Sequence, residues 1–377
     1  MDLRWTSDEL AFRQEAREWL EANVPAEPLP SGDTAEGFAL HLQWEKKLFA
    51  DRWSVVSWPK QFGGREASIW EWLIFEEEYY RAGAPQRVTQ NGIFLLAPTI
   101  FEFGTPEQQE RILPRMAAGE DMWAQGWSEP GAGSDLAAIS SRGVRDDANG
   151  GWRLSGQKTW TTRGAFSTHL FGLFRTDPEA SRHRGLTYFL VPLDAPGVTV
   201  RGFDRLDGDE GFAEVFFDDV FVPDSDVLGG VNQGWSVAMA TTGSERGLTL
   251  RSPGRFLHSS HQLVELAKSR PGQGRLNDRV VQSVIDARAY ELFTLQQVTS
   301  IVAGRAVGAE SSLNKLFWSE LDIRLHETAM ELLGEQAELD GPWSKGFLFS
   351  LAGPIYAGTN EIQRNIVAER VLGLPRK

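Results

Sequence analysis

The chain has 377 residues, of which 41% are hydrophobic and 24% charged, as expected for a folded protein of about two or three domains. Its 38 basic and 52 acidic residues give a formal charge of −14, which argues against a general nucleic-acid binder. The absence of cysteine excludes disulfides, thiol nucleophiles and thiolate metal sites. Neither a signal-peptide pattern nor a long uncharged apolar run is present, so we expect a cytoplasmic protein without a membrane span.

Residues 1–120 have the pattern of a helical domain. Thr6 and Glu9 could form a capping box at the start of a helix whose apolar residues recur at helical spacing until Pro25. Three more helices are expected over approximately 37–51, over 68–81, and after the N-cap pair Thr105–Pro106.

The pattern changes near Asp121, where short apolar runs are separated by Gly, Asp and Pro. The runs that we expect to be strands lie within 152–154, 169–174, 186–192, 198–200 and 215–222. No helical pattern alternates with them, so a small antiparallel sheet or barrel is predicted rather than a doubly wound parallel sheet.

Helical periodicity returns after Gly234. One apolar stripe runs from Leu313 to Leu332, and a second from Ile362 to Val371, before Gly373 ends the pattern. The predicted domains are therefore an N-terminal helical domain over 1–120, a middle β-domain over 121–230, and a C-terminal helical bundle over 231–377.

The segment Trp127–Asp135, with the sequence WSEPGAGSD, is the most unusual stretch of the chain. Its glycines and proline fix a tight loop whose backbone can approach a ligand closely. The N–H groups and hydroxyls of such a loop suit a phosphate or a polar ring edge. The alternative is a structural turn that leads into the sheet. Neither a Walker loop nor a dinucleotide-binding fingerprint is present.

A second segment, Lys158–Thr162, has the sequence KTWTT. A strand tryptophan with hydroxyl neighbours can form a wall against a flat ring and donate hydrogen bonds to the ring edge. The alternative is a cross-strand core tryptophan with threonines that face solvent.

A third segment, Tyr356–Arg364, contains Gly358 and Thr359, which predict a loop followed by a helix N-cap. A helix N-terminus favours anions. The alternative is an ordinary cap without a ligand.

Together and in this order, the three segments resemble the acyl-CoA dehydrogenase family, and so does the loop Trp58–Gly64. The resemblance implies an α+β multidomain fold with a helical N-terminal domain, a small antiparallel β-barrel in the middle, and a C-terminal four-helix bundle. It also implies FAD as cofactor and α,β-dehydrogenation of an acyl-CoA thioester to a trans-2-enoyl-CoA. In that reaction a carboxylate takes the α-proton while the β-hydrogen leaves as hydride, and the electrons pass on to an electron-transfer flavoprotein or a similar acceptor.

Carried onto this sequence, the family's motifs implicate two sets of residues. The residues implied to bind FAD are Trp127, Ser128, Gly133, Ser134, Trp160, Thr161, Thr162, Arg270, Thr359 and Glu361. The residues implied to bind acyl-CoA are Ser134, Ser244, Arg246, Tyr356 and Gly358.

Many family members carry the catalytic glutamate where this chain has Ala357, so the base must come from another position. A second position is used in isovaleryl- and long-chain-type members, on the first helix of the C-terminal domain, directly before an arginine. Glu245 matches this position, since it precedes Arg246 at the right distance from Gly234. The alternative is a solvated glutamate on a helix surface. We expect Glu245 to be the base, with its pKa raised by burial.

Two departures from the family concern contacts that reach FAD across subunits. Where the family has Gln-x-x-Gly-Gly, this chain has Glu331–Ala337, whose carboxylates would repel a pyrophosphate. Arg270 remains, but the phenylalanine that usually follows it does not. Similar losses occur in actinobacterial members that form α2β2 heterotetramers acting on steroid side chains or other bulky acyl-CoAs. A homotetramer and an α2β2 heterotetramer with a related subunit both remain open.

Two alternatives to an acyl-CoA dehydrogenase remain open: a flavin monooxygenase or oxidase of the same fold, and a non-catalytic subunit that completes a partner's site. His258 and His261 have a spacing that metal ligands can use. No acidic or cysteine partner accompanies them in the sequence, so no metal site is assigned.

Overall fold

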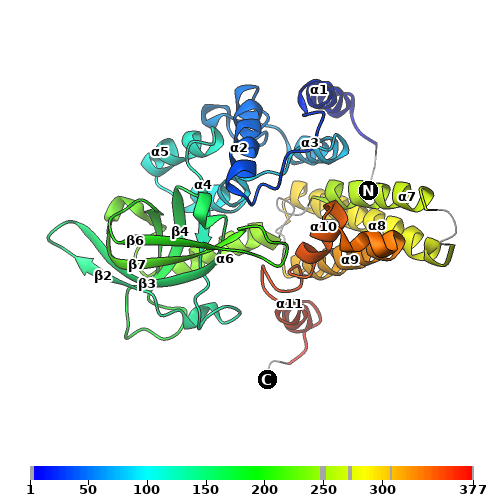
Figure 1. Ribbon diagram of the computed structural model, residues 1–377. Helices are drawn as coiled ribbons and strands as arrows, with labels where there is room; N and C mark the ends of the chain where they lie inside the picture. Colours follow the sequence, from blue (N-terminus) through cyan, green and yellow to red (C-terminus); the bar gives the residue numbers. More distant parts are fainter. Residues whose placement is uncertain (1–3, 247–251, 271–273, 306–307, 376–377) are drawn as a thin grey trace. The chain divides into compact units, whose positions relative to one another are not determined.

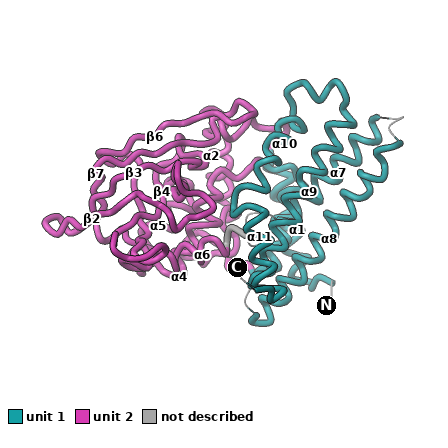
Figure 2. Tube along the Cα trace, turned by 90° about the horizontal axis from the view of Figure 1, so that it is seen from below, with its two compact units in different colours: residues 1–24, 68–84, 246–377 teal, residues 25–67, 85–245 magenta. Residues whose placement is uncertain are grey.

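The computed structural model describes residues 4–246, 252–270, 274–305 and 308–375, except for the side chains of 244–246 (Figure 1). The chain divides into two compact units, which are described here one at a time (Figure 2). Unit 1 comprises residues 1–24, 68–84 and 246–377, and unit 2 comprises residues 25–67 and 85–245. Both units are therefore assembled from segments that are far apart in the sequence.

Unit 2 contains a group of short helices. They are α2 (Ala35–Ala50), α4 (Ala97–Phe103), α5 (Pro106–Ala117) and all but the last residue of α6 (Gly234–Arg246), with a 3-10 turn at Lys60–Phe62 and a π-helical turn at Asn91–Leu96. Local sequence sets where these helices begin. The Thr34 side chain accepts a hydrogen bond from the Gly37 amide, and Thr105 forms a complete capping box with Gln108. The helix starts expected near residue 37 and at Thr105 are confirmed.

The sheet of unit 2 has the strand order β6-β7-β3-β2-β4-β5-β8, with β1 paired to β4 off this path. The strands are β1 (Trp123–Gly126), β2 (Arg142–Asp146), β3 (Gly151–Thr162), β4 (His169–Arg175), β5 (Leu186–Pro192), β6 (Val198–Phe203), β7 (Phe212–Pro223) and β8 (Val227–Leu228). Each of the five expected apolar runs lies in a strand, which confirms the small β-domain.

The expectation of a purely antiparallel sheet needs one correction. β1 runs parallel to β4, with Trp123 opposite His169, and β2 makes a single parallel pairing to β4. Parallel neighbours require a long connection. The 42 residues from Trp127 to Thr168, which include β2 and β3, supply one between β1 and β4.

One face of this sheet carries the apolar core of unit 2. Its buried members include Leu154, Phe174, Phe189, Val215 and Val220, which are all inaccessible to solvent. They come from four strands, and β4 and β5 bury consecutive side chains, so the sheet is covered on both faces along these two strands.

Unit 1 is entirely helical in the residues that the structure describes. Its elements are α1 (Ser7–Asn23), α3 (Ile69–Arg81), α7 (Pro253–Lys268), α8 (Asn277–Val302), α9 (Ser311–Leu333), α10 (Pro342–Ser350) and α11 (Asn360–Ile366), followed by a π-helical turn at Val367–Val371. The helices α7, α8 and α9 pack against one another, and α3 packs on both α1 and α7 (Figure 1). None of the described helices is both long and apolar enough to cross a bilayer.

The two apolar stripes predicted for the C-terminal region have different outcomes. In α9, Leu321, Leu325, Ala329 and Leu332 are buried, although Leu313 at its start is 37% exposed. Along 362–371 the one buried side chain is Gln363, and the apolar residues are half-buried or exposed. This second stripe therefore does not form part of the core that the described residues build.

Candidate active site

The loop Trp127–Asp135 begins where β1 ends, and its position depends on a buried carboxylate. Glu129 accepts hydrogen bonds from the Ser140 amide at 2.6 Å, the Ser140 hydroxyl at 2.8 Å and the Ser141 amide at 2.9 Å. It also forms an ion pair with the Lys158 ammonium at 2.8 Å, and both side chains are almost inaccessible to solvent. The glutamate of the first motif is thus joined directly to the lysine of the second.

Burial alone would raise the pKa of Glu129, but the Lys158 ammonium and the hydrogen bonds from Ser140 and Ser141 outweigh it and hold the pKa well below its usual range. Lys158 also donates to the Leu173 carbonyl at 2.7 Å. The carboxylate is therefore ionised at neutral pH and has a fixed set of partners. Such a group anchors a loop rather than exchanging protons.

The outer side of the same loop is open. Gly131, Gly133 and Ser134 are exposed, and a Cβ placed on either glycine would meet no atom within 4 Å. On the inner side, the Thr159 amide donates to the Ser128 carbonyl at 2.9 Å, which is a second link between the two motifs. The inner side of the loop is therefore held by hydrogen bonds, while its outer side is exposed and can receive a ligand.

The segment Trp160–Thr162 does not continue β3 regularly. The register with β7 shifts between Lys158 and Thr161, and Trp160 adopts a left-handed backbone with φ of 58°. A non-glycine residue in such a conformation costs on the order of 1–3 kcal/mol and is found most often at functional sites. The result is that the Trp160 ring is 61% exposed while Thr161 is fully buried. The alternative of a core tryptophan with solvent-facing threonines is wrong.

Several buried donors next to these segments have no hydrogen-bond partner among the described residues. They are Trp123 Nε1, Gln125 Nε2, Trp127 Nε1 and Thr161 Oγ1. Trp123, Gln125 and Trp127 occupy alternate positions along and just after β1, so they share one face of the strand. Buried polar groups normally have partners, and a cluster without them indicates a ligand that supplies acceptors.

This cluster tests whether the residues present suit FAD. An isoalloxazine ring offers a flat surface and an edge with carbonyl oxygens and ring nitrogens. An exposed tryptophan beside unpartnered buried donors matches both properties, so the residues fit the cofactor. Sequence reasoning found Trp127 and Thr161 but missed Trp123 and Gln125, whose alternation with small residues before the loop was the available signal.

The third motif lies in unit 1 and has the predicted local structure. The Thr359 hydroxyl accepts from the Ile362 amide at 3.3 Å and caps α11. The side-chain amide Nε2 of Gln363 donates to the carbonyls of Ala357 at 2.9 Å and Gly358 at 3.2 Å. Ala357 has a left-handed backbone with φ of 57°, so this turn is also held by specific contacts.

The remaining residues of this motif have different environments. Tyr356 is half-buried and stacks on Trp318 with ring centroids 5.9 Å apart. The Glu361 side chain is 77% exposed. Tyr356 is therefore fixed by packing, whereas Glu361 is exposed and pairs with Arg364 at 3.7 Å.

Two segments that the sequence analysis treated separately meet in unit 1. Arg270 donates a hydrogen bond to the side chain of Gln336, and Glu331 pairs with Arg279. One of the carboxylates in Glu331–Ala337 is thus neutralised by a nearby arginine. Residues 271–273, where the family has its phenylalanine, lie outside the described part of the chain.

Glu245 lies on the last turn of α6. The side chains of Ser244, Glu245 and Arg246 lie outside the description, so the burial expected for Glu245 stays a prediction. One turn earlier, the buried Thr241 hydroxyl contacts the hydroxyls of Thr99 at 2.9 Å and Tyr188 at 3.4 Å. These contacts fix the helix within unit 2.

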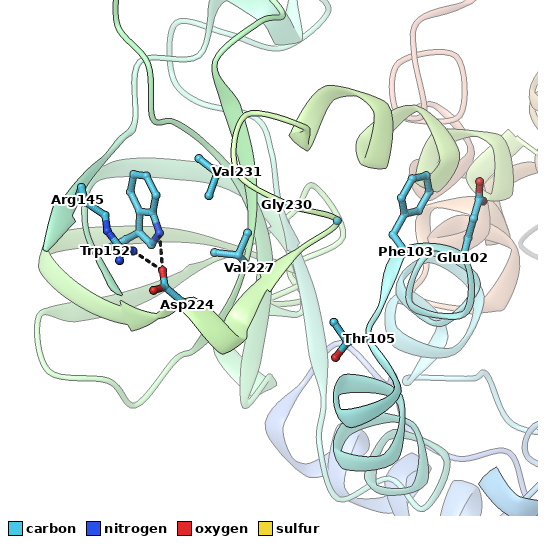
Figure 3. Close-up of a pocket in the computed structure, with 10 residues that line it drawn as sticks. Glu102, Phe103, Thr105, Arg145, Trp152, Asp224, Val227, Gly230 and Val231 are labelled. Atoms are coloured by element: carbon cyan, nitrogen blue, oxygen red, sulfur yellow. Dashed lines mark hydrogen bonds and ion pairs between the residues drawn. The ribbon is translucent and has the colours of Figure 1, made fainter. Parts of the chain in front are cut away.

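A depression of about 730 Å³ lies in another part of unit 2 and contains none of the predicted site residues (Figure 3). On one wall, Arg145 and the indole nitrogen of Trp152 both reach Asp224, the latter at 3.1 Å. Val227 and Val231 lie on the same side of the view, and Phe103 lies across from them. The charges of Arg145 and Asp224 on this wall balance each other, so we assign the depression no part in the chemistry.

The fold and the first two motifs together define a flavin-binding protein, and comparison with known proteins gives the family. Residues 6–120, 124–220 and 232–372 match the family models for the N-terminal, middle and C-terminal domains of acyl-CoA dehydrogenase. The chain belongs to the acyl-CoA dehydrogenase family. It is an FAD-dependent oxidoreductase that acts on acyl-CoA thioesters.

Two similar proteins are named acyl-CoA dehydrogenase IpdE1. The chain is 40% identical over 390 residues to acyl-CoA dehydrogenase IpdE1 of Mycolicibacterium smegmatis, covering 97% of this chain and 98% of the relative. It is 39% identical to IpdE1 of Mycobacterium tuberculosis over 383 residues, covering 97% and 98%.

Two solved structures have the same fold over the full length of both chains. The Tcur3481-Tcur3483 steroid acyl-CoA dehydrogenase is 28% identical with a TM-score of 0.89, covering 100% of each chain. The ChsE4-ChsE5 complex of Mycobacterium tuberculosis is 29% identical with a TM-score of 0.86, again covering 100% of each chain.

Proposed function

We propose that this chain desaturates a bulky, ring-containing acyl-CoA, with Glu245 as the base that removes the α-proton. The flavin chemistry in this proposal rests on the buried, unpartnered donors of Trp127 and Thr161 and on the exposed Trp160, which directly precedes Thr161. Because the C-terminal motif holds Ala357, a carboxylate must come from another position, and Glu245 matches the family's second one.

The chemistry divides between the cofactor and the chain. FAD, when bound, supplies the acceptor for the β-hydrogen. Glu245 takes the α-proton, which is acidic enough only when a carboxylate is positioned against it and donors stabilise charge on the thioester oxygen. Trp160 offers a flat apolar surface, and the Glu129–Lys158 pair keeps the motif loop in place.

The remaining residues are assigned by role. For FAD, these are Trp127, Ser128, Gly133, Ser134, Trp160, Thr161, Thr162, Arg270, Thr359 and Glu361; for acyl-CoA, these are Ser134, Ser244, Arg246, Tyr356 and Gly358. Arg270 and Thr359 are proposed to serve the FAD of a neighbouring subunit. Arg270 lies against Gln336, which belongs to the segment Glu331–Ala337 where the family contacts FAD across subunits.

The substrate class and the assembly are proposed from the relatives and from one surface. Related proteins are described as a steroid acyl-CoA dehydrogenase and as a two-subunit complex. On α8, Val281, Ile285 and Leu292 are 56%, 53% and 46% exposed and share one face by their spacing. An apolar helix face of this kind supports a tetramer built through the C-terminal helices, either from this chain alone or as α2β2 with a related subunit.

Co-purification tests the cofactor first. The chain is expressed alone and together with a related acyl-CoA dehydrogenase subunit from the same source, and bound FAD is measured by visible absorbance. Turnover is then compared between straight-chain acyl-CoAs and acyl-CoAs with a polycyclic ring, using an artificial electron acceptor and then an electron-transfer flavoprotein. Preference for the ring-bearing substrates is expected. A straight-chain preference contradicts the substrate class.

Two further outcomes of the same assay identify the alternatives. Rapid oxygen uptake coupled to substrate turnover indicates a flavin oxidase or monooxygenase. A chain that never binds FAD, but whose presence is needed for the activity of the related subunit, indicates a non-catalytic role.

A further inference from the structure

A buried cluster of charged side chains, formed by Asp33, Arg163 and Arg205, adjoins the Trp160–Thr162 segment through Arg163. Asp33 accepts a hydrogen bond from Arg163 Nε at 2.6 Å and another from Arg205 Nη1 at 2.7 Å. The Asp33 and Arg163 side chains are 6% and 5% exposed. Arg163 is the residue immediately after the motif, whereas Asp33 lies 130 positions earlier in the chain.

Arg163 is held in a conformation that needs support. Its backbone is left-handed with φ of 53°, as is that of Trp160 with φ of 58°, so two such residues enclose Thr161 and Thr162. Non-glycine residues keep this conformation only where the surrounding structure fixes them on several sides.

The backbone of Arg163 is fixed locally. Its amide donates to the Gly211 carbonyl at 3.0 Å. Its carbonyl accepts from the Phe166 amide at 3.0 Å and from the Ser167 hydroxyl at 2.9 Å. The side chain, through Asp33, provides the contact from outside the β-strands.

Asp33 is itself well placed to act as an anchor. It immediately precedes Thr34, the N-cap of α2, and its amide donates to the Ser31 hydroxyl at 3.3 Å. Arg205 binds Asp207 at 2.8 Å and Asp209 at 3.6 Å with its other terminal nitrogen, so Arg205 joins three carboxylates and leaves one Asp33 oxygen for Arg163. The cluster therefore ties the flavin-side turn to the start of α2 as well as to the loop between β6 and β7.

We propose that Asp33 is a positioning residue that, through Arg163, holds the Trp160–Thr162 segment in the conformation that exposes the Trp160 ring to the cofactor. This inference rests on the proposed function, because that function makes Trp160 and Thr162 a wall of the FAD site. Asp33 itself contacts neither the substrate nor the cofactor in this proposal.

The test compares Asp33→Asn with a matched control in the same unit. Glu45 on α2 is also buried, and it pairs with Arg87 at 2.8 Å and accepts from the Thr89 amide at 3.0 Å. Glu45→Gln therefore removes one charge from a second buried pair that does not touch the motif. Two quantities are measured on the full chain, with its partner subunit if FAD binding requires one: amide hydrogen exchange of peptides covering 158–166 without FAD, and the FAD dissociation constant with its visible spectrum.

Asp33→Asn is expected to accelerate exchange in 158–166 and to raise the FAD dissociation constant about tenfold with a shifted spectrum. Asp33→Glu, which restores the charge, is expected to recover part of both effects. Glu45→Gln should lower the melting temperature without changing either quantity. The proposal is overturned if Asp33→Asn changes exchange in 158–166 no more than Glu45→Gln does.

The comparison can still be made if a variant does not fold or if the chain binds no FAD. If Asp33→Asn does not fold, Arg163→Lys keeps the charge but loses the planar guanidinium group, and the same comparison is made with that variant. If the wild-type chain binds no FAD in any combination, the proposed function fails, whereas the exchange comparison without FAD still decides whether Asp33 orders the segment.

Discussion

The two units use buried charge and strained backbone in different ways. Among the described residues, eight non-glycine positions have a positive φ, and seven of them, including Trp160 and Arg163, lie in unit 2. The single one in unit 1 is Ala357, in the third motif. The buried ion pair of Glu129 with Lys158 also lies in unit 2 and joins two motif segments.

Unit 1 shows the opposite arrangement. Its most enclosed carboxylate, Glu78 on α3, binds three arginines that hold helices together: Arg13 and Arg17 on α1, at 2.9 Å and 2.8 Å, and Arg81 on α3, at 2.7 Å. None of these residues belongs to a motif. The Glu129–Lys158 pair therefore fixes a surface prepared for a ligand, whereas Glu78 and its arginines fix helix packing. Variants in the two units should consequently separate chemistry from stability.

The largest effect is expected for Glu245→Gln, at the end of unit 2. Glutamine keeps the size and hydrogen bonding of the side chain but cannot accept the α-proton. Loss of a general base typically costs on the order of 10²–10⁴-fold in rate. Turnover of the best acyl-CoA should fall by that factor, while FAD content and melting temperature stay unchanged. Near-normal turnover would place the base elsewhere, on this chain or on a partner subunit.

Glu129→Gln should affect both stability and cofactor binding, because it leaves the Lys158 ammonium buried without a counter-charge. Breaking a buried pair in this way typically costs about 3–5 kcal/mol. Urea unfolding measures the first effect and FAD titration the second. The double variant Glu129→Gln with Lys158→Met should regain most of the stability, since no unpaired charge remains. Equal instability of the double and single variants would show that the ion pair is not what matters.

Sequence reasoning succeeded where the determining contacts are local. The capping pair Thr6–Glu9 is three residues apart, and the N-cap Thr105 directly precedes Pro106, so the local sequence reveals both helix starts. The motif segments could be recognised for the same reason, because each is a short run of residues whose spacing carries the chemistry.

What the sequence could not give depends on contacts between distant segments. Lys158 and Glu129 are 29 positions apart, and Arg163 and Asp33 are 130 apart, so neither pairing leaves a local pattern. The parallel pairing of β1 with β4 was missed because no strand was expected over Trp123–Gly126, and alternation does not give the direction of a neighbouring strand. The donors of Trp123 and Gln125 are significant only once their burial without partners is known.

In unit 1, Glu78 predicts a pH dependence of stability. Burial alone would raise the pKa of Glu78, but the hydrogen bonds from Arg17, Arg81 and Arg13 and the charge of Arg81 outweigh burial and lower the pKa to about 2. An unfolded glutamate titrates near 4.3, so the contribution is complete above that pH and is lost as the pH falls toward about 2.

The measurement compares wild type with Glu78→Gln. The wild type should be more stable at pH 6, and its advantage should shrink by about 1–2 kcal/mol at pH 3, as followed by urea midpoints. FAD affinity should not change at pH 6. A difference that is constant between the two pH values would contradict the ion-pair explanation.

The smallest energetic effect within the chain is expected on the outer face of α8, where the consequence should instead be a change of assembly. Ile285 is 53% exposed and lies between Val281 and Leu292 on that face, so an aspartate there costs little in the folded subunit but places a charge in any interface that covers it. Ile285→Asp should reduce the mass measured by light scattering while the melting curve of the separated subunit retains a cooperative transition.

Leu206→Asp is the matched control, because Leu206 is 83% exposed in unit 2, on a loop between β6 and β7. If the two variants have the same mass as the wild type, the assembly does not use this face of α8, and the apolar residues of 362–371 become the next surface to test.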